Sequence, residues 1–149
     1  MQTRLLLQLT RKVRLGPIRV AVLMAIVQTP HRFRAKRPLW KYSGFGVVTH
    51  TSADHRYVNG QLERSKRPVS VRGLDPGHNH QLKYLFKSAA IQASTAKGPF
   101  QEFYEALVAK GMRPEMARLT LARKIAVITL TVWKKGAAFD AKYLKSQTA

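Results

Sequence analysis

The run Ile125–Trp133 is apolar almost all the way round a helix, and it limits the folds open to this chain more than any other feature. A helix that is hydrophobic on every face is buried in a domain or lies in a membrane. Nine residues fall well short of the roughly 20 that span a bilayer. Pro114-Glu115 is a good first turn, and Lys135-Gly136 places cations and a glycine at the end. The sequence therefore predicts a helical domain with helix 114–135 at its centre.

Other segments show the apolar spacing of helices that cover such a core. We expect helices over 80–96 and 99–110, a third segment over 32–42, and a short tail after Gly136 that docks two aromatic rings. The inward residues predicted for them are Leu82, Leu85, Phe86, Ala89, Ala90 and Ala93; Phe100, Phe103, Tyr104 and Leu107; Phe33, Leu39 and Trp40; and Phe139 and Tyr143.

The first 28 residues predict two short helices around a hairpin at Leu15-Gly16. Gly16-Pro17 is typical of a helix start. The helix that follows is predicted to be largely buried through Ile18, Val20, Ala21, Val22, Leu23, Ala25 and Ile26. A turn of this kind can point backbone N–H groups at a phosphate, and an ordinary helix pair without a ligand fits the same residues.

The helical period is lost from residue 45 to residue 74. Asn59-Gly60, with short apolar pairs on both sides, predicts a β-hairpin. Thirty residues without helix inside a helical chain are more often a functional insertion than packing. The predicted fold is mainly α, with a helix-hairpin-helix-like start over 1–28, one compact unit overall, and an irregular or β-hairpin insertion around 45–74 in the part that runs from 29 to 149.

The charge of the chain indicates the kind of partner. Lys and Arg number 27 against 7 Asp and Glu, a formal charge of +20, and the first 53 residues hold ten cations and no carboxylate. Such an excess calls for a polyanion, and nucleic acid is the first expectation. The chain has no cysteine, which excludes disulfides, thiolate zinc sites and cysteine nucleophiles and fits a reducing cytoplasm. No apolar run is long enough to span a membrane, so no membrane partner is expected.

Few residues could carry hydrolytic or metal chemistry. Seven scattered acids do not make a two-metal cluster, and no phosphate-binding glycine loop is present. His78-Asn79-His80 fits capping or phosphate contacts better than a metal site, and no metal is expected. His50, Ser52 and Asp54 would share one face of a strand, as a hydrolase triad could. Triad members usually come from separate elements, however, and no oxyanion-hole motif follows Ser52.

Several motifs occur together in one order along the chain. They are Gly16-Pro17-Ile18, Phe33-Arg34, Leu39-Trp40-Lys41-Tyr42-Ser43-Gly44, Thr51-Ser52-Ala53, Arg72-Gly73-Leu74, Asn79-His80-Gln81-Leu82-Lys83, Lys87-Ser88-Ala89-Ala90, Ala122-Arg123-Lys124-Ile125-Ala126 and Trp133-Lys134. From about Leu15 to Leu144, this pattern resembles the C-terminal serine domain of the "one-ten" insertion-sequence transposases. Arg14-Leu15-Gly16 stands where that family commonly has Gly-Ile-Gly.

The resemblance implies a role for Ser52 as the nucleophile that cleaves and transfers DNA strands. In the family, an N-terminal RuvC-like half supplies metal-binding acids, and a structured bridge RNA selects the DNA. Magnesium and a guide RNA are thus implied for the complete enzyme, and no cofactor for this chain alone. We expect a truncated transposase half that lacks the RuvC-like half, is not active alone, and forms a homo-oligomer through that missing or separate half. Without the resemblance, Ser52 fits a loop serine that caps a turn.

The chemistry of such a serine sets what must surround it. A hydroxyl that attacks a phosphodiester needs cations over the phosphoryl oxygens and a proton acceptor. The candidate cations are Arg56, Arg64, Arg67 and Arg72, and the candidate acceptors are His50 and His55. The residues expected to bind nucleic acid are Gly16, Arg34, Lys36, Arg37, Asn79, His80, Lys83, Arg123 and Lys124.

The expected partners are DNA and structured RNA, and the expected location is the bacterial cytoplasm, at the nucleoid. A non-catalytic basic RNA-binding protein of ribosomal style would carry +20 equally well and stays the alternative.

Overall fold

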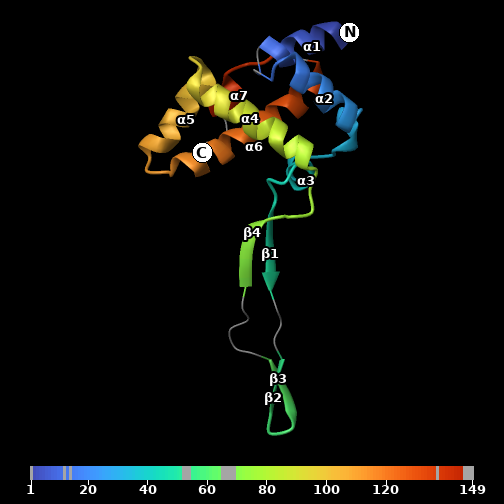
Figure 1. Cartoon of the computed structure of the whole chain (residues 1–149), viewed down its shortest axis with the longest axis vertical. Helices are drawn as coiled ribbons and strands as arrows, with labels where there is room; N and C mark the ends of the chain where they lie inside the picture. Colours follow the sequence, from blue (N-terminus) through green and yellow to red (C-terminus); the bar gives the residue numbers. More distant parts are fainter. Residues whose placement is uncertain are drawn as a thin grey trace.

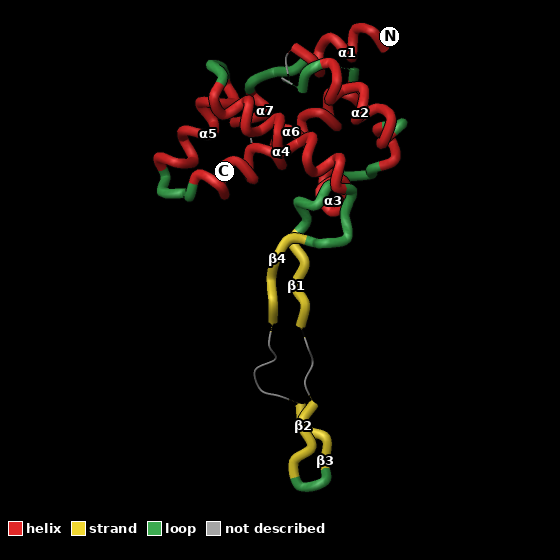
Figure 2. The backbone as a smooth tube through the Cα atoms, viewed as in Figure 1, coloured by secondary structure: helices red, strands yellow, loops and turns green. Residues whose placement is uncertain are grey.

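The computed structural model describes residues 2–11, 13, 15–51, 55–64, 70–136 and 138–145. These residues form a helical body from which a β arm projects (Figures 1 and 2). The elements, in chain order, are α1 (Gln2–Arg11), α2 (Pro17–Val27), the 3-10 turn η1 (Pro30–Arg32), α3 (Lys36–Tyr42), β1 (Val47–Thr51), β2 (His55–Val58), β3 (Gln61–Arg64), β4 (Ser70–Leu74), α4 (His80–Thr95), α5 (Pro99–Ala109), α6 (Pro114–Lys135) and α7 (Lys142–Lys145). The predicted mainly α fold with a β-hairpin insertion is confirmed.

Helix α6 is the centre of the body, as predicted. It contacts α1, α3, α4 and α5, and α4 lies across it in the middle of the body (Figure 1). Its buried apolar residues are Ala117, Leu121, Ala122, Ile125, Ala126, Ile128, Leu130 and Val132. The predicted stripe of α4 is buried in full, because its spacing of three and four residues keeps those side chains on one face.

The helix ends follow the predicted signals. Pro99 and Pro114 lie in the first turn of α5 and α6, where the missing N–H costs nothing. Gly136 ends α6 in the left-handed conformation at φ 60°, which glycine adopts without strain. The tail then docks its ring as expected, since Phe139 stacks on Phe100 with ring centroids 5.4 Å apart. The tail is not all coil, because α7 follows.

Helix α2 differs from its prediction. Only Val20, Leu23 and Val27 are buried, whereas Ile18 is 79% exposed and Val22 is 37% exposed. The prediction of a largely buried helix is therefore wrong. The reason is that α2 packs on α1 and α4 along one side and nothing in the described part of the chain covers the other.

The segment 32–42 also starts later as a helix than expected. Thr29 caps the turn η1, and the backbone is extended at Phe33 and Ala35, so α3 begins only at Lys36. The predicted orientation of the segment holds nonetheless. Phe33 and Leu39 are buried, and Trp40 packs against the core.

The described residues of the insertion form two antiparallel strand pairs, which make up the β arm. Strand β1 pairs with β4 from Val47↔Leu74 to Thr51↔Ser70, and β2 pairs with β3 from His55↔Arg64 to Val58↔Gln61. The turn at Asn59-Gly60 has positive φ at both positions, 51° and 78°, as the tight hairpin turn requires. The predicted hairpin is confirmed, and it lies at the far end of the arm from the helices (Figure 2).

Candidate nucleic-acid interface

A cationic cleft lies where the arm leaves the helical body. We call it the root cleft. It has a volume of about 680 Å³, and the residues that line it are Arg37, Trp40, Lys41, Phe45, Gly46, Val47, Val48, Arg72 and Arg123. Four of these nine are cations, and none of these described lining residues is acidic. Such a cleft is complementary to a phosphate backbone and has apolar walls for sugars or bases.

The end of α3 holds the first residues of the arm. The backbone N–H groups of Phe45 and Gly46 both donate to the Trp40 carbonyl, over 2.8 and 3.0 Å. The Ser43 hydroxyl, fully buried, donates to the Leu39 carbonyl over 2.6 Å. On the return strand, Asp75 N–H donates to the Gly46 carbonyl over 3.1 Å. These bonds fix the direction in which both strands of the arm leave the body.

Arg123 of α6 also holds the residues between α3 and β1. Its Nε and Nη2 donate to the Phe45 carbonyl over 3.0 and 2.8 Å, and the Trp40 indole N–H donates to the Arg123 carbonyl over 3.2 Å. Burial lowers the pKa of Arg123. The sequence predicts that Arg123 binds nucleic acid; in the structure its guanidinium lines the root cleft and donates to a backbone carbonyl.

The start of α4 is hydrogen-bonded to the end of α3, next to the residues where the arm begins. Asn79 N–H donates to the Tyr42 carbonyl over 2.8 Å, and the Asn79 side chain caps α4 by accepting from Leu82 N–H over 2.9 Å. Gly44 has φ +79°, and a Cβ there would lie 2.7 Å from the His78 ring. A residue larger than glycine would therefore push α4 away from the root.

The structure brings together some of the residues predicted to bind nucleic acid. Arg37, Arg72 and Arg123 meet in the root cleft, and Arg34 and Lys36 are exposed at and just before the start of the same helix, α3. His80 is exposed at the start of α4, 4.4 Å from the His78 ring between centroids.

The remaining three predicted residues lie elsewhere. Lys83 lines a separate groove with Lys87 and Arg118, and Gly16 lines a groove between α2 and α4. Lys124 is buried, and its Nζ donates to the Tyr143 carbonyl over 3.2 Å. Burial and the nearby charge of Lys36 lower the pKa of Lys124. The position of Lys124 is that of a core residue.

Those residues predicted for strand cleavage that the structure describes belong to the strands of the arm. Arg72 stands opposite Thr49 in the β1–β4 ladder, and Arg64 stands opposite His55 in the β2–β3 ladder. His50 and Arg56 are residues of β1 and β2. Ser52, Asp54 and Arg67 lie outside the described residues, so both the nucleophile and the alternative triad stay predictions.

Lys41 is the cation of the root cleft that the sequence analysis did not select as a site residue. Arg37 and Lys41 are four residues apart on one exposed helical face, and that spacing is the signal that could have found it.

Metal ligands and membrane spans were also sought in the described part of the chain. There, no three His, Asp or Glu side chains gather in a way that could hold a metal ion. The described residues therefore offer no ligand set for the magnesium that the family resemblance implies for the complete enzyme. None of the described helices is long and apolar enough to cross a membrane.

Comparison with known proteins identifies the family. The model described as "Transposase IS116/IS110/IS902 family" matches residues 8–105, about two thirds of the chain. The match includes the whole arm and three of the four cations of the root cleft. No curated protein and no solved structure matches. The match supports a transposase role, and the ribosomal alternative gains no support. The chain belongs to the IS116/IS110/IS902 transposase family.

Proposed function

We propose that the chain is the DNA-binding serine half of a transposase, in which Ser52 attacks a DNA phosphodiester. The observation that carries the proposal is the root cleft, because it places four cations at the base of the strand that leads to Ser52. Strand β1 ends at Thr51, and Ser52 is the next residue in the sequence.

Binding of DNA by the root cleft and the arm rests on charge and shape. The exposed cations Arg37, Lys41 and Arg72 lie where both strands leave the body. A two-stranded β-ribbon has a width that the major groove of B-DNA admits. An isolated hairpin is marginally stable in water, and the tip of this one exposes 79% of Tyr57 and 57% of Leu62. A duplex along the arm would cover these side chains. A structured guide RNA, which is also a polyanion, is the second ligand proposed for this surface.

The chemistry proposed for Ser52 conserves the energy of the phosphodiester. The serine oxygen forms a bond to phosphorus as the bond from phosphorus to one deoxyribose oxygen breaks, and that oxygen takes up a proton. The serine proton passes to an acceptor, for which His50 and His55 are the candidates. Arg56, Arg64, Arg67 and Arg72 are the candidates to neutralise the phosphoryl oxygens, and Arg67 lies outside the described residues. The ester can later be attacked by a DNA hydroxyl, so a strand is rejoined without ATP. The complementary acids would come from a RuvC-like half.

The binding part is tested by the salt dependence of DNA affinity. Each phosphate contact contributes about one unit to the slope of log K against log salt. Arg37→Met and Arg72→Met are each expected to weaken binding and to lower that slope by about 1. Lys110→Met, an exposed cation at the end of α5, is the matched control and should leave the slope unchanged. Equal slopes for all three variants would contradict a DNA site at the root cleft.

The chemical part is tested by a covalent adduct. The chain is mixed with a RuvC-like partner, magnesium and end-labelled DNA, and the products are run on a denaturing gel. A band in which DNA is bound to protein is expected for the wild type and for Ser70→Ala, a serine on the opposite strand of the arm, and it should be absent for Ser52→Ala. Salt-sensitive DNA binding should survive in Ser52→Ala. An adduct of equal intensity in Ser52→Ala would refute the role of Ser52.

A further inference from the structure

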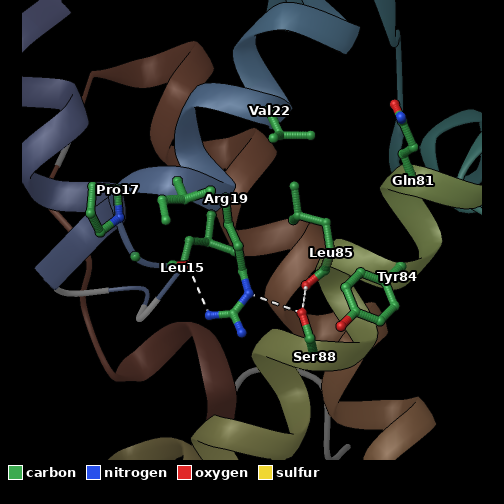
Figure 3. Close-up of a pocket in the computed structure, with 10 residues that line it drawn as sticks. Leu15, Pro17, Arg19, Val22, Gln81, Tyr84, Leu85 and Ser88 are labelled. Carbon is green, nitrogen blue, oxygen red and sulfur yellow. Dashed lines mark hydrogen bonds between the residues drawn. The ribbon is translucent and has the colours of Figure 1, made fainter.

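A second groove, of about 520 Å³, lies between α2 and α4, on the helical body (Figure 3). We call it the α2–α4 groove. Leu15, Gly16, Pro17, Ile18, Arg19 and Val22 come from α2 and its approach, and Gln81, Tyr84, Leu85 and Ser88 come from α4. Its volume is within the about 300–1,000 Å³ typical of small-molecule sites. Of the predicted nucleic-acid residues, only Gly16 lies here.

The walls of the groove are apolar and open to solvent. Ile18 is 79% exposed, Tyr84 is 74% exposed and Val22 is 37% exposed. An exposed aromatic ring beside aliphatic side chains makes an apolar groove that the described part of the chain leaves open to solvent. A planar aromatic ligand would stack on Tyr84 and take apolar surface out of water.

Polar side chains also line the groove, with Arg19 and Ser88 close together and Gln81 apart from them (Figure 3). Arg19 reaches from α2 to α4 (Figure 3), where its Nε donates to the Ser88 hydroxyl over 2.9 Å and its Nη1 donates to the Gln92 side-chain oxygen over 2.8 Å. These bonds hold the guanidinium at the groove. Among the described residues Nη2 has no hydrogen bond, which leaves a donor for a ligand. Gln81, exposed on α4, adds an amide with both donor and acceptor atoms.

The charge around the groove favours an anionic ligand. Neither α2 nor α4 contains an acidic residue. Lys83 and Lys87 of α4 line the separate groove together with Glu115, so Arg19 is the cation that lines the α2–α4 groove. An apolar groove with an exposed aromatic ring, hydrogen-bonding side chains and one arginine matches the face, the polar edge and the phosphate of one nucleotide.

We propose that the α2–α4 groove binds an unpaired nucleobase, stacked on Tyr84, of the nucleic acid that the chain holds. The inference rests on the proposed function, since it assumes that the chain binds nucleic acid. It adds a preference for strands with unpaired bases, which the phosphate contacts of the root cleft do not provide.

The test compares two ligands with three variants of the full chain. The ligands are a single-stranded oligonucleotide and a blunt duplex of the same sequence. Tyr84→Ala is expected to raise the Kd for the single strand about 5- to 150-fold, the range for loss of one stacked base, and to leave the Kd for the duplex unchanged. Tyr84→Phe keeps the ring and should bind as the wild type does. Ile91→Ala, 52% exposed further along α4 and outside the groove, is the matched control.

A fluorescent base gives a second readout. A 2-aminopurine placed in the single strand should be quenched on binding to wild type and to Tyr84→Phe, and less so on binding to Tyr84→Ala. Because Tyr84 is exposed, the alanine variant is expected to unfold at the wild-type temperature, which a thermal scan checks.

The outcomes separate this inference from the proposed function. If the chain binds neither ligand, both fail. If it binds both and Tyr84→Ala changes neither Kd, or changes the two equally, the groove holds no base while the proposed function stands. If Ile18→Glu abolishes self-association and leaves binding of both ligands intact, the groove is a protein contact and the inference is wrong.

Discussion

The anchoring of the arm by Arg123 leads to a quantitative prediction. In Arg123→Met the long apolar stem is kept, but two hydrogen bonds from a charged donor to the buried Phe45 carbonyl are lost. Hydrogen bonds to charged groups contribute about 1.5–3 kcal/mol. The two hydrogen bonds share one acceptor, and the half-buried guanidinium carries a desolvation cost, so we take about 1.5–3 kcal/mol for both together. For a chain of this size that lowers Tm by about 3–12 °C.

The assay is urea unfolding followed by tryptophan fluorescence, with Arg37→Met as the matched control. Both arginines line the root cleft, but Arg37 is exposed. Its replacement should change stability by no more than about 0.5 kcal/mol while weakening DNA binding. If Arg123→Met unfolds at the wild-type urea midpoint, or if Arg37→Met destabilises the chain as much, the anchoring argument is refuted.

Three further predictions test separate parts of the structure. Burial lowers the pKa of Lys124 from its ordinary value of 10.5, so below pH 10.5 the unfolded state binds more protons than the folded state. The free energy of unfolding should therefore rise with pH in that window. In Lys124→Met this rise should be lost, as measured by urea midpoints between about pH 8 and 10.5. Gly44→Ala should lower the free energy of unfolding by about 2–5 kcal/mol, because of its positive φ and the contact with His78. Gly136→Ala should lower it by about 1–2 kcal/mol, because φ is positive there but the space is open. Equal unfolding midpoints for the two variants would disprove the close contact. In thermal unfolding, Asn79→Ala should lose about 0.5–2 kcal/mol of stability and Asn79→Asp almost none, because both Asn and Asp cap a helix. An equal loss in both variants would show that Asn79 does not stabilise the chain as a helix cap.

The helices could be predicted well because their signals are local. Apolar spacing gives the buried face of α4, and Pro114 and Gly136 set the ends of α6. In the insertion, Asn59-Gly60 demands positive φ at two positions, which few residue pairs tolerate, so its hairpin was also predictable.

The sequence of a helix does not show, in contrast, which other elements will cover its faces. Helix α2 is apolar on most faces, which fits burial, yet Ile18 and Val22 are exposed because the body packs on one side only. A similar limit applies to charge. Sequence gives the number of cations but not their partners, so Lys124 was predicted to bind nucleic acid although it lies in the core.

The sequence could indicate several residues of the root cleft, but not that they lie together. Arg37, Arg72 and Arg123 were each selected, from three segments far apart in the sequence, but only the fold shows that they meet. Pairing of β1 with β4 brings Arg72 back to α3, and the register of such a long-range pair cannot be read from either strand alone.

The most direct measurement is the site of the covalent bond between protein and DNA. The adduct formed with a RuvC-like partner is digested with protease and nuclease, and the remaining nucleotide is located on the peptide by tandem mass spectrometry. The mass of a nucleotide phosphate on the Ser52 oxygen is the predicted result. A nucleotide on any other residue, with Ser52 unmodified, would contradict the proposed chemistry.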